Sequence, residues 1–160
     1  MRRVRLTLLL AAIGLLAVGG VAGHVIAQSG GSTVTRTALA ESNKVRGASG
    51  RTLGLSRVTI PVRGTIALHH HEGTQVAYIQ AGVLTYTVKS GSVTVSSGPA
   101  DNPSVVRKIS GGQSGQLRAG QWIVEQPSTI HRAANKGKTK VVIYLATLLK
   151  RGAPPSTPNG

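Results

Sequence analysis

Short runs rich in β-branched residues, separated by glycines, make up most of the chain from Arg51 onward. Such runs are typical of β-strands, and their spacing of roughly 8 to 12 residues favours an all-β sandwich or barrel. The last run could be a short buried helix, but its Val, Val, Ile and Tyr at 141–144 favour a strand. The predicted strands cover residues 55–62, 65–71, 75–80, 83–89, 92–97, 104–109, 115–120, 121–126 and 140–149.

Three other stretches have a different texture. Residues 28–50 are rich in Gly, Ser, Thr and charge, which predicts a flexible linker with one short ordered piece at TRTALA, 35–40. Residues 151–160, RGAPPSTPNG, predict a disordered tail. The connector over 89–116 is rich in Gly and Pro, and we expect a hairpin excursion with a mobile tip that lies over the barrel mouth. The predicted barrel domain is 51–150.

The first 27 residues have the layout of a signal peptide. Three arginines precede an unbroken apolar run from Leu6 to Gly23, and Val25 and Ala27 stand at small-residue cleavage spacing. An uncleaved N-terminal membrane anchor helix is the alternative, because the run would span most of a bilayer. Four glycines weaken the run as a helix and favour cleavage. Either way we expect an exported bacterial protein, secreted or held in the periplasm or cell envelope.

Charge and cysteine content indicate how the domain is stabilised and which kinds of partner it binds. The chain has no cysteine, so the exported domain must rely on packing rather than disulfides. It carries 19 Lys and Arg against four acids, and it stays near +12 after the leader's three arginines are subtracted (16 minus 4). The basic residues are scattered and few aromatics accompany them, which argues against nucleic acid. An anionic cell-envelope polymer or lipid surface is the expected partner, and a merely solvated basic surface is the alternative.

Three of the five histidines stand side by side in ALHHHEGTQ. Successive side chains alternate faces in a strand, so His69 and His71 point together and His70 points away. A tight turn at EGT follows, and the returning strand brings Gln75 beside the first two. The remaining histidine beyond the leader is His131, which a folded metal site would require as a distant partner and a compositional histidine tract would not.

These residues resemble the two motifs of the cupin superfamily. The spacing of His69, His71, Gln75 and Gly82 matches the first motif, and GQWIVEQPSTIHRAAN, with His131, is similar to the second. The resemblance covers about residues 51–150 and implies a double-stranded β-helix of the jelly-roll type. The chain departs from the motifs in having Gln75 for the usual glutamate, Gln126 for a proline and Ser128 for a glycine.

The resemblance also implies a divalent transition metal held by four ligands: His69, His71, Gln75 and His131. Three imidazoles suit Fe, Mn, Ni, Cu or Zn, and the identity stays open. A neutral amide at Gln75 is a weaker ligand than a carboxylate and cannot act as a general base, so the site should prefer an anionic or oxygen-chelating ligand. Glu72 lies in the turn and is expected to face solvent. No catalytic residue can be named.

Two functions remain open from the sequence. One is a metal-binding cupin for a small polar or anionic molecule, with oxidative chemistry of the dioxygenase type if it is an enzyme. The other is a non-catalytic ligand- or metal-binding module of the cell envelope. Isomerase chemistry on sugars ranks last because its catalytic pair cannot be aligned. The resemblance also makes a homodimer an option.

Side chains near the motifs are expected to be structural. Tyr78, Tyr86, Trp122 and Tyr144 are predicted to fill the core rather than to line a pocket, since the chain has no Phe. Strand alternation turns Arg132 away from the face that His131 uses, which predicts a solvated arginine.

Overall fold

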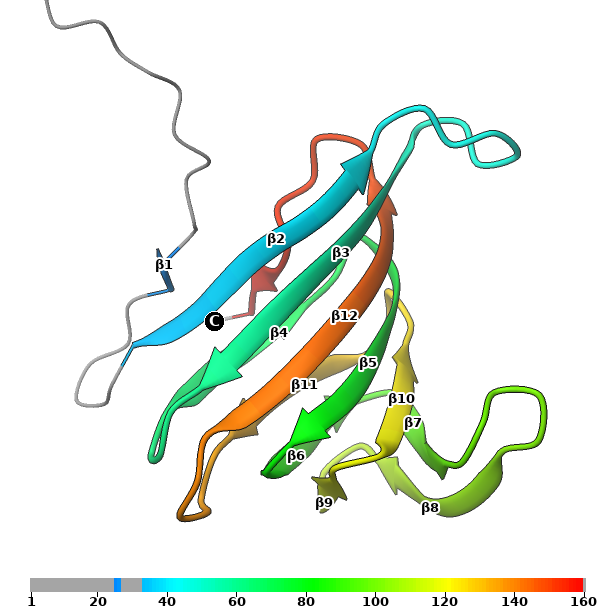
Figure 1. Cartoon of the computed structure of the whole chain (residues 1–160). Helices are drawn as coiled ribbons and strands as arrows, with labels where there is room; N and C mark the ends of the chain where they lie inside the picture. The colour runs from blue at the N-terminus through cyan, green and yellow to red at the C-terminus, as the bar shows by residue number, and fades with distance from the viewer. Residues whose placement is uncertain (1–24, 27–32, 160) are drawn as a thin grey trace, which may run out of the picture.

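The computed structural model describes residues 25–26 and 33–159, and all of their regular elements are strands (Figure 1). Apart from residues 25–26, the predicted leader lies outside the described residues. Within the described ranges, no helix is long and apolar enough to cross a membrane. The strands are β1 (Val25–Ile26), β2 (Val34–Ser42), β3 (Arg51–Ile60), β4 (Thr65–His70), β5 (Gly73–Ala81), β6 (Val83–Ser90), β7 (Ser92–Ser97), β8 (Ser104–Ser110), β9 (Ser114–Arg118), β10 (Gln121–Glu125), β11 (Ile130–Ala134), β12 (Val141–Lys150) and β13 (Thr157–Pro158).

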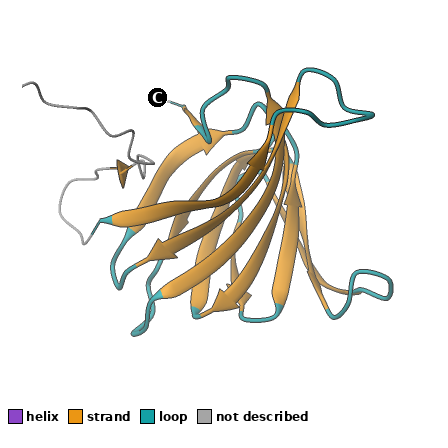
Figure 2. Ribbon diagram, turned by 45° about the horizontal axis from the view of Figure 1, so that its top comes forward, coloured by secondary structure: helices purple, strands orange, loops and turns teal. Residues whose placement is uncertain are grey.

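The strands form two antiparallel sheets that face each other across one core. One sheet has the order β1-β2-β3-β12-β5-β10-β7-β8, and the other has the order β13-β4-β11-β6-β9. Figure 2 shows both sheets curving around a shared interior. The predicted all-β barrel is confirmed, and each of the nine predicted strands is present.

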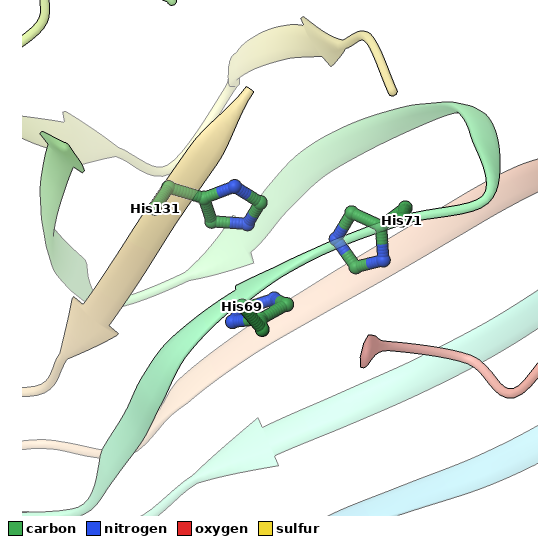
Figure 3. A group of neighbouring side chains, drawn as sticks. All are labelled: His69, His71 and His131. Carbon is green, nitrogen blue, oxygen red and sulfur yellow. The ribbon is translucent and has the colours of Figure 1, made fainter. Parts of the chain in front are cut away.

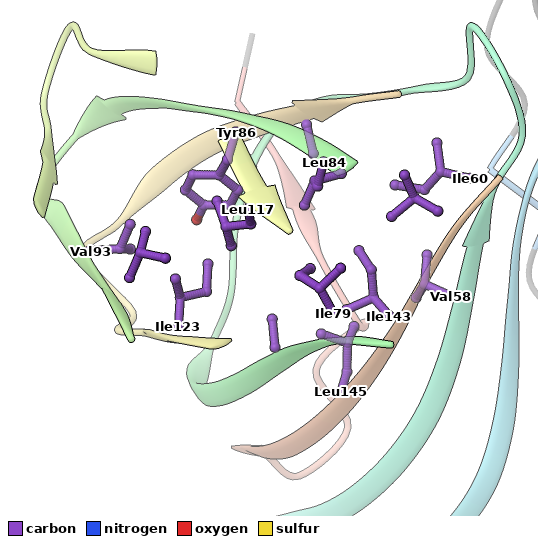
Figure 4. Packing of buried hydrophobic residues seen from close by; sticks show 14 of the residues in the cluster. Val58, Ile60, Ile79, Leu84, Tyr86, Val93, Leu117, Ile123, Ile143 and Leu145 are labelled. Atoms are coloured by element: carbon purple, nitrogen blue, oxygen red, sulfur yellow. The ribbon is translucent and has the colours of Figure 1, made fainter. Parts of the chain in front are cut away.

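Alternation along the strands builds the core. In β12 every second residue faces inward, so Val141, Ile143 and Leu145 are buried while their neighbours are not. The same period on other strands completes a cluster dominated by Val, Ile and Leu (Figure 4). Full burial of one such side chain contributes about 1.5–3 kcal/mol, which lets the barrel form without disulfides.

Residues 34–42 are a strand and not a linker, which corrects the sequence prediction for 28–50. Strand β2 pairs along β3 from Thr35↔Thr59 to Ser42↔Leu53, with one bulge near Ala38. Most of its side chains are exposed, so the sequence carries little hydrophobic signal there. The expected ordered piece, TRTALA, lies wholly inside the strand.

The end of the chain also differs from the expected disordered tail. Strand β13 pairs with β4, with Thr157 opposite His70 and Pro158 opposite His69. The backbone N–H of Asn159 then donates to the carbonyl of Leu68 at 3.0 Å. Because prolines interrupt this segment, sequence pattern alone does not predict a strand in it.

Two glycines of the cupin-like motifs occupy left-handed turns. Gly82 has a φ of 81° and Gly120 a φ of 82°, a conformation that favours glycine. At Gly82 a Cβ would also lie 2.6 Å from the carbonyl oxygen of Lys140. Glycine at these positions is therefore a backbone requirement of the fold.

Candidate metal centre

His69, His71 and His131 meet inside the barrel (Figure 3). His69 on β4 lies directly opposite His131 on β11, and His71 follows β4 on the same face. All three are buried, and one ring nitrogen from each lies within 4.8 Å of the others. The strand alternation that predicted this grouping is confirmed, and the distant His131 lies in the same group.

Backbone carbonyls fix the tautomer of each ring. Nδ1 of His69 donates to Ala67 at 2.7 Å, and Nδ1 of His131 donates to Thr129 at 3.2 Å. Nδ1 of His71 donates to Pro155 at 2.8 Å. A carbonyl oxygen can only accept, so each Nδ1 must carry a proton, and Nε2 is the atom left to bind a metal when the ring is neutral. Outer hydrogen bonds of this kind orient histidine for metal binding.

Burial favours the neutral form of His69 and His71. It is the largest cause that lowers the pKa of His69 to about 4, and the nearby His131 adds to it. Burial also lowers the pKa of His71, although Glu125 pulls in the opposite direction. At neutral pH the rings of His69 and His71 are therefore in the neutral form that binds a metal.

Gln75 lies in the same buried group. It extends from β5, and its Nε2 donates to Nε2 of His71 at 2.8 Å and to Oε2 of Glu125. Its Oε1 is buried and has no hydrogen-bond partner. An unpaired buried oxygen is costly. An acceptor in this position can still coordinate a cation or accept a hydrogen bond from a molecule in the barrel.

Glu125 is a member of the site that the sequence analysis did not select. It is fully buried on β10, directly across the sheet from Gln75. The hydroxyl of Tyr86 donates to its Oε1 at 2.7 Å. Its carboxylate also lies 3.2 Å from Nε2 of His131 and 3.5 Å from Nε2 of His71. A carboxylate is thus present, although it comes from β10 and not from position 75.

The surroundings keep this carboxyl ionised. Burial by itself would raise the pKa of Glu125, but the charges of His131 and His71 and two hydrogen bonds outweigh it, so the pKa is lowered. Burial and the neighbouring carboxylate raise the pKa of Tyr86 well above its ordinary value. Tyr86 therefore remains a phenol and a hydrogen-bond donor over the physiological range.

The donor set fits a divalent cation. Nε2 of His131 lies 3.2 Å from the carboxylate of Glu125, so a cation or a proton must lie between these two atoms. Oε1 of Gln75 likewise has no group that donates to it. Three imidazoles with nearby oxygens match the ligand preferences of Fe, Mn, Ni, Cu and Zn.

A small cavity adjoins these groups. Its volume is about 60 Å³, more than the roughly 10–15 Å³ that one water needs. The histidines, Glu125 and Gln75 line one part, and apolar side chains such as Ile143 and Leu145 line another. Ser156 of the C-terminal segment and Arg36 of β2 complete the wall. The 89–116 excursion contributes no lining residue, so the expectation that it covers the mouth is not met.

Other residues considered from the sequence lie away from the centre. His70 faces the opposite side, where its Nδ1 lies 2.6 Å from Oδ1 of Asn159 and its Nε2 lies 3.4 Å from Glu72. The Glu72 side chain is 44% exposed, as expected for a turn residue. Arg132 is exposed on the outer face of its sheet, which confirms the prediction from alternation.

The aromatic residues that were predicted to fill the core differ in their burial. Tyr86 is 2% exposed and lines the cavity, so the expectation that it only fills the core is incomplete. Tyr78 is 40% exposed and is not a core residue. Trp122 lies half-buried, and its Nε1 donates to the carbonyl of Gly98 at 3.2 Å.

A signal for Glu125 was present in the sequence. The run QWIVE alternates, so Glu125 shares the inward face of Ile123. An acid on the buried face of a strand, in a chain with only four acids, is unusual. The motif comparison drew attention to position 75 instead.

Comparison with known proteins places the fold. The chain is similar in structure to a cupin superfamily protein from Desulfitobacterium hafniense (15% identity, 77% of this chain and 84% of that one, TM-score 0.51). It is also similar to a cupin-like protein (14%, 81% and 78%, 0.53) and a predicted oxalate decarboxylase (18%, 79% and 91%, 0.53), both from Thermotoga maritima. No protein family model and no curated protein matches the sequence. At these identities the likeness establishes the fold.

Proposed function

We propose that this chain, which has the cupin fold, is an exported protein that binds a divalent transition metal and a small anionic ligand inside its barrel. The observation that carries the proposal is that three buried histidine rings converge. Each ring is held by a hydrogen bond from its Nδ1 to a backbone carbonyl. The three histidines are the principal ligands, with Gln75 Oε1 or Glu125 as the oxygen donor. A bound metal would supply a Lewis acid that holds and polarises a ligand oxygen.

Glu125 strengthens the case for an enzyme. Gln75 cannot accept a proton, but an ionised carboxylate beside the cavity can, and Tyr86 would then hydrogen-bond to the resulting carboxyl group. A metal-dependent oxidoreductase of the dioxygenase type fits this set of groups. Structural relatives differ in chemistry: one is described as a predicted oxalate decarboxylase and another, from Streptomyces resistomycificus (14% identity, TM-score 0.52), as a polyketide cyclase. The fold alone therefore does not choose the reaction.

A non-catalytic binding module is the second candidate. The favouring observation is that Glu125 already has close contacts with Gln75, Tyr86 and two histidines, which would hold it as a structural group. Oxygen consumption with phenolic, diketone and thiol compounds separates the two candidates. Turnover that is lost in a Glu125→Gln variant with full metal content supports the enzyme, and metal binding without turnover supports the module.

Elemental analysis of tag-free protein tests the proposal directly. The purified protein should hold, or take up on incubation with Fe, Mn, Ni, Cu or Zn, about one equivalent per chain. A His70→Gln variant is the matched control, since it removes an adjacent imidazole outside the cluster and should keep full uptake. Failure of the wild-type protein to bind any of these metals would refute the metal proposal.

Location in the cell envelope rests on the leader and the charge. A separate groove of about 760 Å³ on the outer face of β4, β11 and β6 is lined by Lys89, Arg132 and Lys136, which suits an anionic polymer or lipid surface. Binding to vesicles containing anionic lipid should weaken as salt rises, and a variant with these three residues changed to Gln should bind less. The mass of the exported protein tests cleavage of the leader.

A further inference from the structure

Arg36 is a cationic side chain of the cavity wall that the metal centre does not use. It extends from β2, where it lies on the inner face opposite Val58. Its Nε donates to Oγ of Ser56 at 3.2 Å, which anchors the guanidinium at one edge. The two terminal nitrogens make no hydrogen bond within the described part of the chain.

No counter-ion pairs directly with this charge, and the carboxylate of Glu125 acts on it only from a distance. Among residues 33–159, no carboxylate lies within ion-pair distance of Arg36. The cavity's own acid, Glu125, is already engaged by Gln75 and Tyr86. A partly buried cation without an anion is unfavourable, because it has lost water contacts without gaining a partner.

The rest of the wall around Arg36 is apolar. Val58, Ile143 and Leu145 line the cavity beside it, so they offer no alternative partner for an anion. Burial is the main cause that lowers the pKa of His71, and the charge of Arg36 contributes to the same shift, which agrees with its lying on the side of the metal centre.

We propose that Arg36 is the anion-binding residue of the cavity and that the ligand is a small carboxylate held between Arg36 and the histidine centre. The terminal guanidinium nitrogens can bind a carboxylate through two parallel hydrogen bonds. A cavity of about 60 Å³ restricts the ligand to a few heavy atoms. The inference rests on the proposed function only for the contact between the ligand and the metal. The contact between the ligand and Arg36 does not depend on it.

Acetate binding tests this assignment. Affinities for acetate and for neutral acetamide are measured by calorimetry in the wild-type protein and in Arg36→Gln, each with and without Zn²⁺. Acetate should bind roughly 10- to 100-fold more weakly to Arg36→Gln in both metal states, the loss expected for hydrogen bonds to a charged group. Acetamide binding should not distinguish the two proteins.

Three further variants keep the test specific. Arg57→Gln removes the same charge from an exposed site one strand away and should leave acetate binding unchanged. Arg36→Lys keeps the charge without the two-pronged geometry, and Ser56→Ala removes the anchor of Nε. Both should give smaller losses than Arg36→Gln, and they preserve the test if Arg36→Gln does not fold.

The outcomes separate the two proposals. Absence of acetate binding to the wild-type protein, a change of less than about twofold in Arg36→Gln, or an equal loss in Arg57→Gln would each overturn the role of Arg36. Binding of inorganic phosphate in place of acetate would overturn the carboxylate class. If Zn²⁺ is not taken up but the Arg36 effect persists in the metal-free protein, the metal proposal fails and this inference stands.

Discussion

The barrel interior has an apolar region, which is held by packing, and a polar region, which is held by specific contacts. Val93, Val95 and Leu117 belong to a cluster of buried hydrophobic side chains that packing satisfies. Around His131 and Glu125 the buried side chains are polar, and each depends on a particular partner. Packing satisfies the first region, whereas the second leaves an oxygen of Gln75 without a hydrogen-bond partner.

Replacing His131 with Ala should give the largest effect on the polar region. Metal affinity should fall by more than about 100-fold, because even an outer-shell partner of a metal ligand is worth 10- to 100-fold. Competition with a chromophoric chelator measures the affinity, and His70→Gln is the control. Retained affinity in His131→Ala would mean that the metal binds elsewhere.

Truncation of a side chain in the apolar region should lower stability and leave metal affinity unchanged. Leu117→Ala is expected to lower the free energy of unfolding by about 2–5 kcal/mol through lost burial and a residual cavity. Metal affinity of the folded fraction should not change. Urea unfolding measures the loss, and Leu39→Ala, at a 47% exposed position, should cost at most about 0.5 kcal/mol. A coupled loss of metal affinity in Leu117→Ala would show that the two regions are not independent.

Acid should weaken the metal-free protein through the polar region. The pKa of His69 is about 4 in the folded protein and 6.5 ordinarily, so the unfolded chain binds more protons between these values. Stability is therefore full above pH 6.5 and is lost as the pH falls toward 4, by about 3 kcal/mol from this residue. The lowered pKa of Glu125 acts in the same direction.

Urea unfolding between pH 7.5 and 4.5 in the presence of a chelator measures this loss. A His69→Gln variant should show a shallower dependence on pH, and His70→Gln should behave as the wild type. Equal slopes in the wild-type and His69→Gln proteins would contradict the assignment.

Gln75→Glu should give the smallest effects. It should destabilise the metal-free protein and favour the metal-bound protein. The new carboxylate would lie beside Glu125, so the metal-free protein should lose about 1–3 kcal/mol of stability from like-charge repulsion and burial. The same charge should tighten metal binding by about tenfold or less. Chelator competition and urea unfolding measure the two quantities. Unchanged metal affinity would indicate that position 75 does not coordinate.

Sequence reasoning found the parts of the molecule that follow a simple period. Strand alternation and motif spacing located the barrel, and they brought His69 and His71 to one face with His131. They did not find β2, because Arg36 and its neighbours lie on a strand with little apolar pattern. They did not select Glu125, since its role depends on cross-strand pairing with Gln75, which no local pattern encodes.

The hydrogen bond from the His71 ring to the carbonyl of Pro155 joins residues 84 positions apart. It makes the order of synthesis relevant to the centre. All three imidazoles are present once His131 has emerged from the ribosome, but the carbonyl that orients the second of them belongs to Pro155, which is made later. The centre is therefore completed only after its three histidines have been made, and a chain cut just before Pro155 would keep all three imidazoles and yet hold His71 loosely.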